Sequence, residues 1–579
     1  MMTGSPRQWI GWSACATLAL LLLACGGSPS TPAPTSTTAD LVLLGGTIHT
    51  MQPAKPRAQA VAIRDGRVAA VGSDAEVGAF VGPHTRVVNL QGKAVTPGIV
   101  DGHCHLHGLG SSLESLSVRG IDSPAAAGQL VAAVTSQRAE GEWILGRGWD
   151  QNRWVPAVFP DHTVLTAAAP KHPVALFRID GHALWANAAA MKAAGIRRDT
   201  PDPAGGKIYR DAQGEPTGVF VDNAMALIEA KIPPDPAPVR ERRILRAAEV
   251  AVSLGLTGVH EMGIDDQTVA VYRALAKEDR LPLRVYAYLA GEGQIDALRS
   301  RRPDVDTDGT AMFVLRGVKL FADGALGSRG ASLLAPYDDD PANSGLSLMP
   351  AAELRRSAQV VAASGFQLAV HAIGDRANRE VLDAFEAAGA DPKADQNADK
   401  NAGKPADLRF RVEHAQVLAP EDIPRFAKLG VIASMQPTHA TSDMPWAEAR
   451  VGAARIKGAY AWRSILTTGA RITFGSDFPV EETSPLLGIY AAVTRQDPKG
   501  SPPGGWTAEQ KLTLDEAIAA FTVEPAYASF VEAYRGRIAP GFVADLTVFD
   551  RALTPDRGLL ETKVEMVILG GRVREIRAD

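Results

Sequence analysis

Two patterns of hydrophobic and polar positions divide the chain. Near both ends, short apolar and β-branched runs are separated by glycine-containing turns, at residues 41–50, 60–72, 85–98, 536–550 and 564–576. Runs of this kind, joined by Gly-Gly, Asp-Gly and Gln-Gly turns, are typical of β-hairpins. We expect the two end segments, 40–97 and 535–579, to pair into one small β-sandwich.

The segment between them, residues 98–534, has a different pattern. Apolar runs that end in a polar residue alternate with alanine-rich stretches of helical periodicity, as repeated βα units with a parallel sheet do. Eight runs fit strands: 95–105, 255–263, 283–290, 316–324, 366–375, 409–417, 431–439 and 471–479. No Gly-x-Gly-x-x-Gly turn follows any of them, so the pattern favours a TIM (β/α)8 barrel over an open doubly wound sheet. The predicted fold class is therefore α/β.

Two intervals are longer than a plain βα unit needs. Residues from about 107 to 250 separate the first predicted strand from the second, and we expect a large insertion there. Residues 390–407 are polar and of low complexity, which indicates an insertion on the surface.

The first residues of the chain have the pattern of a secretory signal. One positive charge, Arg7, precedes a mostly apolar run from Ile10 to Ala24, which is too short and wrongly flanked for a membrane-spanning helix. We predict that residues 1–24 are a signal peptide. Residues 25–39 are small, hydroxylated or proline apart from Cys25, and we expect a flexible tether because they cannot bury apolar area.

The end of the signal resembles the lipobox of bacterial lipoproteins. The residues at 22–25 read Leu-Leu-Ala-Cys, and in lipoproteins the signal is cut before the cysteine, which then receives lipid. The resemblance implies that Cys25 is a lipid anchor and that the protein lies in the cell envelope, on the periplasmic side or at the outer membrane. The alternative is an ordinary signal peptide that leaves a free thiol.

Composition narrows the possible partners. The 579 residues are 46% hydrophobic and 22% charged, as in a folded globular protein, and 60 Lys and Arg against 65 Asp and Glu give a net charge of −5. Such a balance lacks the basic field of a nucleic-acid-binding protein, so we expect no nucleic-acid partner and no membrane contact except through the lipid. Three cysteines cannot form a disulfide framework. The oligomeric state stays open, a dimer included.

Ionisable residues interrupt the predicted strands near their ends. His103 and His105 stand two apart on an extended run, so both imidazoles face the same side. Further along the chain, Lys319, His371, His414 and Asp477 lie in or at the ends of the fourth, fifth, sixth and eighth strands. Because buried charges without partners are costly, their convergence at one barrel mouth indicates a shared cation.

Motifs along nearly the whole chain resemble one known family. They are PGIVDGHCHL, DGHALWAN, GEPTGVFVDNA, GVKLFADGALGSR, HAIGDRA, RVEHAQ, QPTHATSD, GSDFPVE and GRIAPGFVADLTVFD. Together they are similar to the amidohydrolase superfamily, specifically its amidohydrolase 3 group of YtcJ-like metal-dependent hydrolases. The match is specific for the family and much less so for the substrate.

The resemblance implies a role for each of the six residues. His103, His105 and Asp477 would bind the more buried metal, and His371 and His414 the second. Lys319 would bridge the two ions after CO2 converts its amine to a carbamate, an anionic ligand with two oxygens; an exposed strand-end lysine is the alternative. Imidazole and carboxylate ligands suit Zn2+, with other divalent metals open.

The reaction follows from such a site. A metal-bound water has its pKa lowered toward about 7, and Asp477 would act on that water as general base and then on the leaving nitrogen as general acid. We expect hydrolysis of a non-peptide, amide-type C–N bond in a small molecule. The alternatives are a deaminase or a cyclic amidohydrolase on the same site, and a non-catalytic surface binding lipoprotein.

Specificity is expected to lie in the long insertion, which holds four of the nine tryptophans. We predict a pocket wall made by Trp149, Arg178, Asp180 and Trp185, since aromatic rings with a few polar groups are the usual lining of a small-molecule site. His182 would contact the substrate or the oxyanion, or instead hold the insertion on the barrel. His107, His260 and His439 are interpreted as residues that support the ligands or fill the core.

Overall fold

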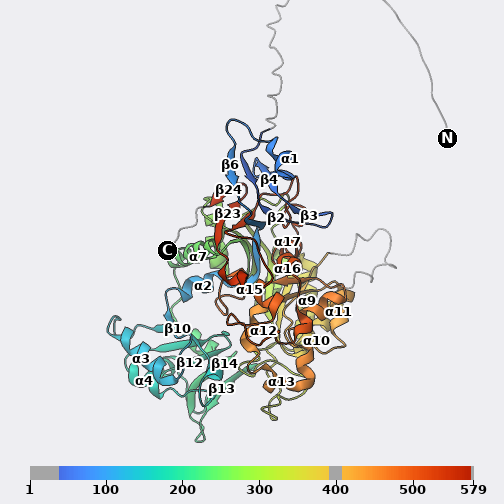
Figure 1. Cartoon of the computed structure of the whole chain (residues 1–579). Helices are drawn as coiled ribbons and strands as arrows, with labels where there is room; N and C mark the ends of the chain where they lie inside the picture. Colours follow the sequence, from blue (N-terminus) through green and yellow to red (C-terminus); the bar gives the residue numbers. More distant parts are fainter. Residues whose placement is uncertain (1–37, 292, 390–406, 575–579) are drawn as a thin grey trace, which may run out of the picture. The chain divides into compact units, whose positions relative to one another are not determined.

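The computed structural model describes residues 38–291, 293–389 and 407–574 (Figure 1). The predicted signal peptide, Cys25, most of the tether and residues 390–406 of the polar insertion lie outside these residues. Ala39, which we place in the tether, is buried and donates its N–H to the Phe80 carbonyl (2.8 Å), so the folded part includes it. In the described residues, no helix has both the length and the apolar character that a membrane crossing requires.

The centre of the fold is a sheet of eight parallel strands. In chain order they are β8 (Ile99–Cys104), β15 (Leu256–Ile264), β16 (Arg284–Ala290), β17 (Phe313–Phe321), β18 (Gln367–Ala372), β19 (Arg411–His414), β20 (Ile432–Met435) and β21 (Ile472–Phe474), and each pairs with the next. Each of the eight predicted runs overlaps one of these strands. The predicted α/β barrel is therefore confirmed.

The first and last strands of the barrel approach each other beyond the regular ladders. The Asp477 N–H, just after β21, donates to the carbonyl of His103 in β8 (2.8 Å). Gly102 permits this approach, since a Cβ there would lie 2.5 Å from Thr473 Oγ1 and 2.7 Å from the Phe474 carbonyl oxygen. The contact places the ends of the first and eighth strands side by side.

Helices pack around the barrel and share one hydrophobic core with it. Of the helices that pack in this way, those of at least seven residues are α2 (Leu106–Ser112), α7 (Ala237–Ser253), α8 (Asp266–Lys277), α9 (Ala351–Ser364), α10 (Asp375–Ala387), α11 (Ile423–Leu429), α12 (Pro437–Asp443), α13 (Ala447–Arg455), α15 (Pro485–Thr494) and α16 (Leu514–Ala520). Helix α8 shows why they form where they do: Asp265 caps its first turn by accepting from the Thr268 N–H (2.8 Å), and its buried face carries Val269, Tyr272 and Leu275.

The two chain ends form a pair of sheets, as expected. One sheet has the order β5-β4-β1-β6 and the other β24-β23-β22-β7-β2-β3. Their strands are β1 (Leu41–Leu44), β2 (Thr47–Gln52), β3 (Lys55–Ala58), β4 (Ala60–Arg64), β5 (Arg67–Gly72), β6 (Arg86–Asn89), β7 (Ala94–Pro97), β22 (Leu546–Phe549), β23 (Val564–Leu569) and β24 (Arg572–Arg574). Side chains of both sheets, such as Leu43 and Val548, share one core, and the N- and C-terminal strands lie together in Figure 1.

The long insertion after β8 folds into a mixed sheet of its own, with the order β13-β14-β12-β11-β10-β9. Its strands are β9 (Leu116–Ser117), β10 (Ile144–Trp149), β11 (Val174–Arg178), β12 (Ala183–Ala186), β13 (Gly206–Arg210) and β14 (Pro216–Asp222), and its helices are α3 (Pro124–Thr135), α4 (Thr163–Ala168), α5 (Ala188–Ala194) and α6 (Ala226–Glu229). The Arg119 guanidinium donates to the carbonyls of Pro479 and Val480 (2.8 Å each), which ties the insertion to the loop after β21.

Candidate active site

The six predicted metal ligands all lie at or near the C-terminal ends of barrel strands. His103 is in β8 and His105 directly follows it; Lys319, His371 and His414 are in β17, β18 and β19; Asp477 comes three residues after β21. Parallel strands bring these ends to one face of a barrel. His103, His105, His371, His414 and Asp477 each also lie in direct ring or charge contact with another member of the set.

Asp477 lies between the two histidines of the first strand. Its Oδ1 is 3.4 Å from His103 Nε2 and 3.2 Å from His105 Nε2. The other ring nitrogen of His105 faces the Met262 carbonyl oxygen (3.1 Å), which fixes the ring with Nε2 toward the carboxylate. Burial alone raises the pKa of Asp477, but the two nearby histidines hold it well below the ordinary value, so the carboxylate is anionic.

His414 joins this group from the sixth strand. Its ring lies 4.9 Å from that of His103 and 4.6 Å from that of His371, and Gln436 Oε1 holds its Nδ1 at 2.8 Å. Ligand atoms of His103, His414 and Asp477 all lie within 4.8 Å of one another. The compact set thus includes His414, which the family resemblance places on the second metal.

Left-handed backbone conformations aim two of these side chains. His414 has φ 72° and Asp477 has φ 60°, which costs of order 1–3 kcal/mol per residue. Strand alternation would turn His414 away from the side that Glu413 faces. The positive φ of His414 at the strand end lets Glu413 and His414, although adjacent in sequence, both contact His103.

Lys319 is buried and lines the same cavity as His105, His371, His414 and Asp477. Its Nζ lies 4.7 Å from the centre of the Phe321 ring. The charge of Lys319 contributes to the lowered pKa of His371 and of His414, after the larger effect of burial. The two imidazoles are therefore neutral, which is the form that binds a metal.

A buried ion pair supports His103 from behind. His103 Nδ1 donates to Glu413 Oε2 (2.5 Å), and Arg411 donates to both oxygens of Glu413 (2.7 and 2.9 Å). Arg411 also donates to the Gly102 carbonyl and to Ser434 Oγ, both at 2.7 Å. Such a histidine–carboxylate pair fixes the tautomer in which the other nitrogen, Nε2, binds a metal.

The polar atoms left over at this site fit a cation. His103 Nε2 and Asp477 Oδ1 are buried and have no hydrogen-bond partner among the described residues. Such atoms are rare in folded proteins because each costs about 1–3 kcal/mol. Two imidazoles and a carboxylate within reach of one another are a suitable donor set for a divalent ion such as Zn2+.

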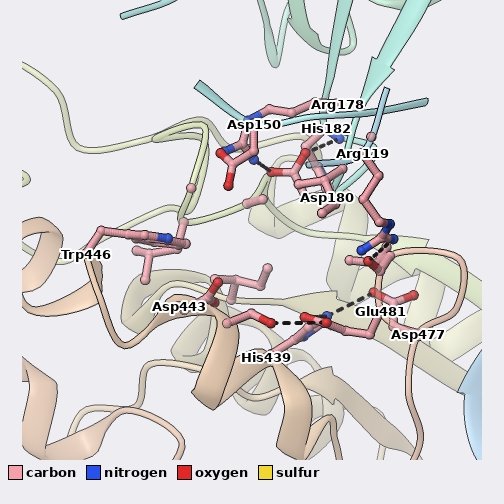
Figure 2. A pocket seen from close by; sticks show the side chains of 18 of the residues that line it. Arg119, Asp150, Arg178, Asp180, His182, His439, Asp443, Trp446, Asp477 and Glu481 are labelled. Carbon is pink, nitrogen blue, oxygen red and sulfur yellow. Dashed lines mark hydrogen bonds and ion pairs between the residues drawn. The ribbon is translucent and has the colours of Figure 1, made fainter. Parts of the chain in front are cut away.

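Two cavities open onto this centre. One, of about 300 Å³, is lined by Asp150, Arg178, Asp180, His182, His439, Asp443, Trp446 and Glu481. Figure 2 shows the residues of the insertion on one side of it and His439, Asp443 and Trp446 on the facing side. The other, of about 520 Å³, contains Lys319, His105 and Arg147, and both cavities share His182, His371, His414 and Asp477.

Three of the expected pocket residues lie at these cavities. Arg178 is buried and donates to Asp180, to Asp150 Oδ1 (2.5 Å) and to Gln151 Oε1 (2.7 Å), so its charge is compensated within the insertion. His182 Nδ1 lies 2.7 Å from Asp222 Oδ1, and its ring is 4.8 Å from that of His371. Burial lowers the pKa of His182, but the hydrogen bond and charge of Asp222 raise it above the ordinary value.

Trp149 and Trp185 line neither cavity, so the prediction that they form the wall of the substrate pocket is wrong. Trp149 and Trp185 are buried in the core of the insertion, with ring centres 6.1 Å apart. Their indole N–H groups donate to the carbonyls of Leu176 (2.8 Å) and Asp161 (2.9 Å). A different tryptophan, Trp446 after α12, is the one that faces the pocket.

The three other histidines have separate surroundings. His260 is deep in the barrel, with Nδ1 2.8 Å from Arg411 Nη1, and His107 Nε2 lies 3.6 Å from Asp235 Oδ2. His439 Nε2 lies 3.7 Å from Asp477 Oδ2 at the pocket. Our sequence interpretation did not include Glu413, Asp222 or Arg147; the alternation of Arg411 and Glu413 along a barrel strand was the available signal for the first of them.

Comparisons with known proteins decide the family. The profile of the amidohydrolase family (Amidohydro_3) matches residues 86–574. The chain belongs to the amidohydrolase family. It is 34% identical over 515 residues to the putative amidohydrolase YtcJ of Bacillus subtilis, which covers 87% of this chain and 93% of that protein.

Two further relatives support this family assignment. The N-substituted formamide deformylase of Arthrobacter pascens is 29% identical over 535 residues, covering 88% of this chain and 93% of its own. An uncharacterized metal-dependent hydrolase from Pyrococcus horikoshii has a crystal structure that covers 90% of this chain and 99% of that chain, with a TM-score of 0.71 and 29% identity. This amidohydrolase is therefore an enzyme, a metal-dependent hydrolase that acts on C–N bonds.

Proposed function

We propose that this amidohydrolase hydrolyses a non-peptide, amide-type C–N bond of a small molecule at the centre formed by His103, His105, Lys319, His371, His414 and Asp477. The observation that carries the proposal is the pair of buried, unpartnered atoms His103 Nε2 and Asp477 Oδ1, 3.4 Å apart. Asp477 lines a cavity that a small substrate can enter.

The metal centre is the first part of the proposal. His103 and Asp477 would hold a divalent ion, Zn2+ by the chemistry of the donors, with His105, His371 and His414 around them and Lys319, as a carbamate, completing the set. When bound, such an ion makes its water acidic and polarises the substrate carbonyl. The remaining tasks, which are to orient the substrate and to transfer protons, would fall to side chains of the protein.

Asp477 is the proposed general acid and base. Its low pKa keeps it ionised, and its Oδ2 points toward His439 Nε2 (3.7 Å) at the substrate pocket. From this position it accepts a proton from the attacking water and delivers one to the leaving nitrogen. The surrounding histidines hold the carboxylate in place for both steps.

His182 is the proposed donor to the carbonyl oxygen. It lines both cavities next to His371, and Asp222 keeps it oriented and favours its protonated form. A protonated imidazole stabilises the negative charge that develops on the oxygen in the transition state. Arg178 and Asp180 shape the adjoining wall, with Trp446 across from them.

Amine release from N-formyl, N-acyl and cyclic amides by the metal-loaded protein tests the proposal. Asp477→Asn should lower kcat by about 10²–10⁴-fold, the usual contribution of general acid–base catalysis. Asp279→Asn, which changes an exposed carboxylate paired with Arg572 (3.4 Å), is the matched control and should leave kcat unchanged. Full activity of Asp477→Asn would overturn the proposal.

We also propose that Cys25 anchors the protein in the cell envelope through lipid. The lipobox-like residues 22–25 support this, and they lie outside the described residues. In cells fed labelled palmitate, the protein should carry label and fractionate with membranes, and Cys25→Ser should do neither. A wild-type protein without label would contradict the anchor.

A further inference from the structure

One arginine faces the second cavity without a counter-ion. Arg147, near the end of β10, lines the cavity of about 520 Å³ that holds Lys319 and the metal-ligand candidates. Among the described residues, its only hydrogen bond runs from Nη2 to the Ile179 carbonyl (2.9 Å), and its Nε is buried without a partner. Arg147 takes part in no ion pair there, unlike Arg178 or Arg240.

The carboxylates of the same cavity already have partners. Asp180 pairs with Arg178, and Asp265 with Arg240 (3.0 Å). Glu261 accepts from the backbone N–H groups of Leu106 and His107. Arg147 is thus a charged group of this wall that makes no ion pair with the carboxylates around it.

The position of Arg147 relates it to the reacting atoms. Its guanidinium lies against the loop that carries His182, since a Cβ on Gly181 would be 3.2 Å from Nη2. Burial lowers the pKa of Arg147, and the charges of Asp477 and Asp180 oppose that effect. The guanidinium therefore lies against the loop of His182, the proposed donor to the substrate's carbonyl oxygen.

We propose that Arg147 binds a carboxylate group of the substrate, so that the enzyme acts on amides that carry an acidic group. This inference rests on the proposed function and names the substrate class. A guanidinium offers two parallel N–H donors that match a carboxylate, and a partly buried charge that makes no ion pair is stabilised by such a ligand. A doubly charged phosphate is disfavoured because Asp180 and Asp477 are near.

Binding of two probes that contain no C–N bond tests the inference without depending on hydrolysis. The probes are 3-phenylpropanoate and its neutral counterpart 3-phenylpropan-1-ol, titrated calorimetrically into the metal-loaded full chain. The wild type should prefer the carboxylate. Arg147→Gln should weaken carboxylate binding about tenfold or more, the loss expected for a charge-assisted hydrogen bond, and leave the alcohol unchanged.

Two variants complete the test. Arg147→Lys keeps the charge without the two-pronged geometry and should fall between the wild type and Arg147→Gln. Arg138→Gln removes an exposed arginine that is paired with Glu142 (2.5 Å) and should change neither affinity. The inference is overturned if Arg147→Gln weakens both probes equally or neither, or if Arg138→Gln shows the same selective loss. A failed amide screen would refute the proposed function and leave this result standing.

Discussion

Glu413 holds His103 in place from inside the barrel: Oε2 accepts from Nδ1 at 2.5 Å, and both side chains are fully buried. The carboxylate increases the basicity of the ring and leaves Nε2 as the atom that faces Asp477. The strength of the metal site should therefore depend on a residue that does not touch the metal.

Glu413→Gln keeps the size of the side chain and an oxygen acceptor but removes the charge. Zinc affinity, measured by competition with a chelator, should fall by about 10–100-fold, as for other residues that support a metal ligand. Glu421→Gln, on the surface and paired with Arg379 (2.6 Å), is the control. Unchanged zinc affinity of Glu413→Gln would show that the pair has no such role.

Lys319→Ala should lose metal and activity together, because a bridging carbamate would be removed. Short carboxylic acids added to this variant should restore part of the activity by supplying an anionic two-oxygen ligand. Lys277→Ala, at the exposed end of α8, is the matched control and should behave as the wild type. Full activity of Lys319→Ala without added acid would refute the bridging role.

Trp185 lies in the core of the insertion, whereas Trp446 lines the pocket, so their substitutions should have different effects. Trp185→Ala should lower the free energy of unfolding by about 3–5 kcal/mol, since it leaves a cavity in the core of the insertion. Trp446→Ala, by contrast, should change KM more than stability because its ring faces the pocket. Chemical denaturation together with steady-state kinetics measures both effects. A stability loss from Trp446→Ala as large as that from Trp185→Ala would contradict this assignment.

A buried ion pair joins the barrel to the terminal sheets and predicts a pH dependence. Arg284 in β16 donates to Asp545 (2.7 and 3.0 Å), which directly precedes β22. Burial alone raises the pKa of Asp545, but the charge and hydrogen bonds of Arg284 lower it below the ordinary value. The pair's contribution is therefore complete above the unfolded pKa of about 3.9 and is lost as the pH falls through the folded pKa.

Asp545→Asn should accordingly cost about 3–5 kcal/mol of stability, because it leaves Arg284 buried without its partner charge. In urea denaturation of the metal-free protein, the difference from the wild type should stay constant between about pH 5 and 8 and shrink below about pH 4. A difference that grows as the pH falls would contradict the sign of this argument.

The barrel and the six ligand candidates could be predicted because they follow from local patterns. His103 and His105 share a face by strand alternation. The C-terminal ends of the strands of a parallel barrel lie on one face, whatever the lengths of the connecting loops. His414 was less predictable, since its direction depends on a left-handed φ of 72° that alternation does not foresee.

The insertion could not be predicted in the same detail. Its sheet combines parallel and antiparallel pairs, so the sequence did not tell which of its side chains face the barrel. A tryptophan such as Trp149 is equally suited to a core and to a pocket wall, and tertiary packing decided for the core. Arg147 was missed for the same reason, because its place beside Gly181 depends on two adjacent strands of that sheet.

The metal content of the purified full chain tests the central claim most directly. Elemental mass spectrometry of the wild type should find one or two divalent ions per chain, with zinc predominant. The His103→Ala, Asp477→Ala double variant, once circular dichroism has shown that it is folded, should contain almost no divalent metal. A wild type without stoichiometric Zn, Mn or Fe, or a double variant with full metal content, would contradict the assignment of these residues as a hydrolytic metal centre.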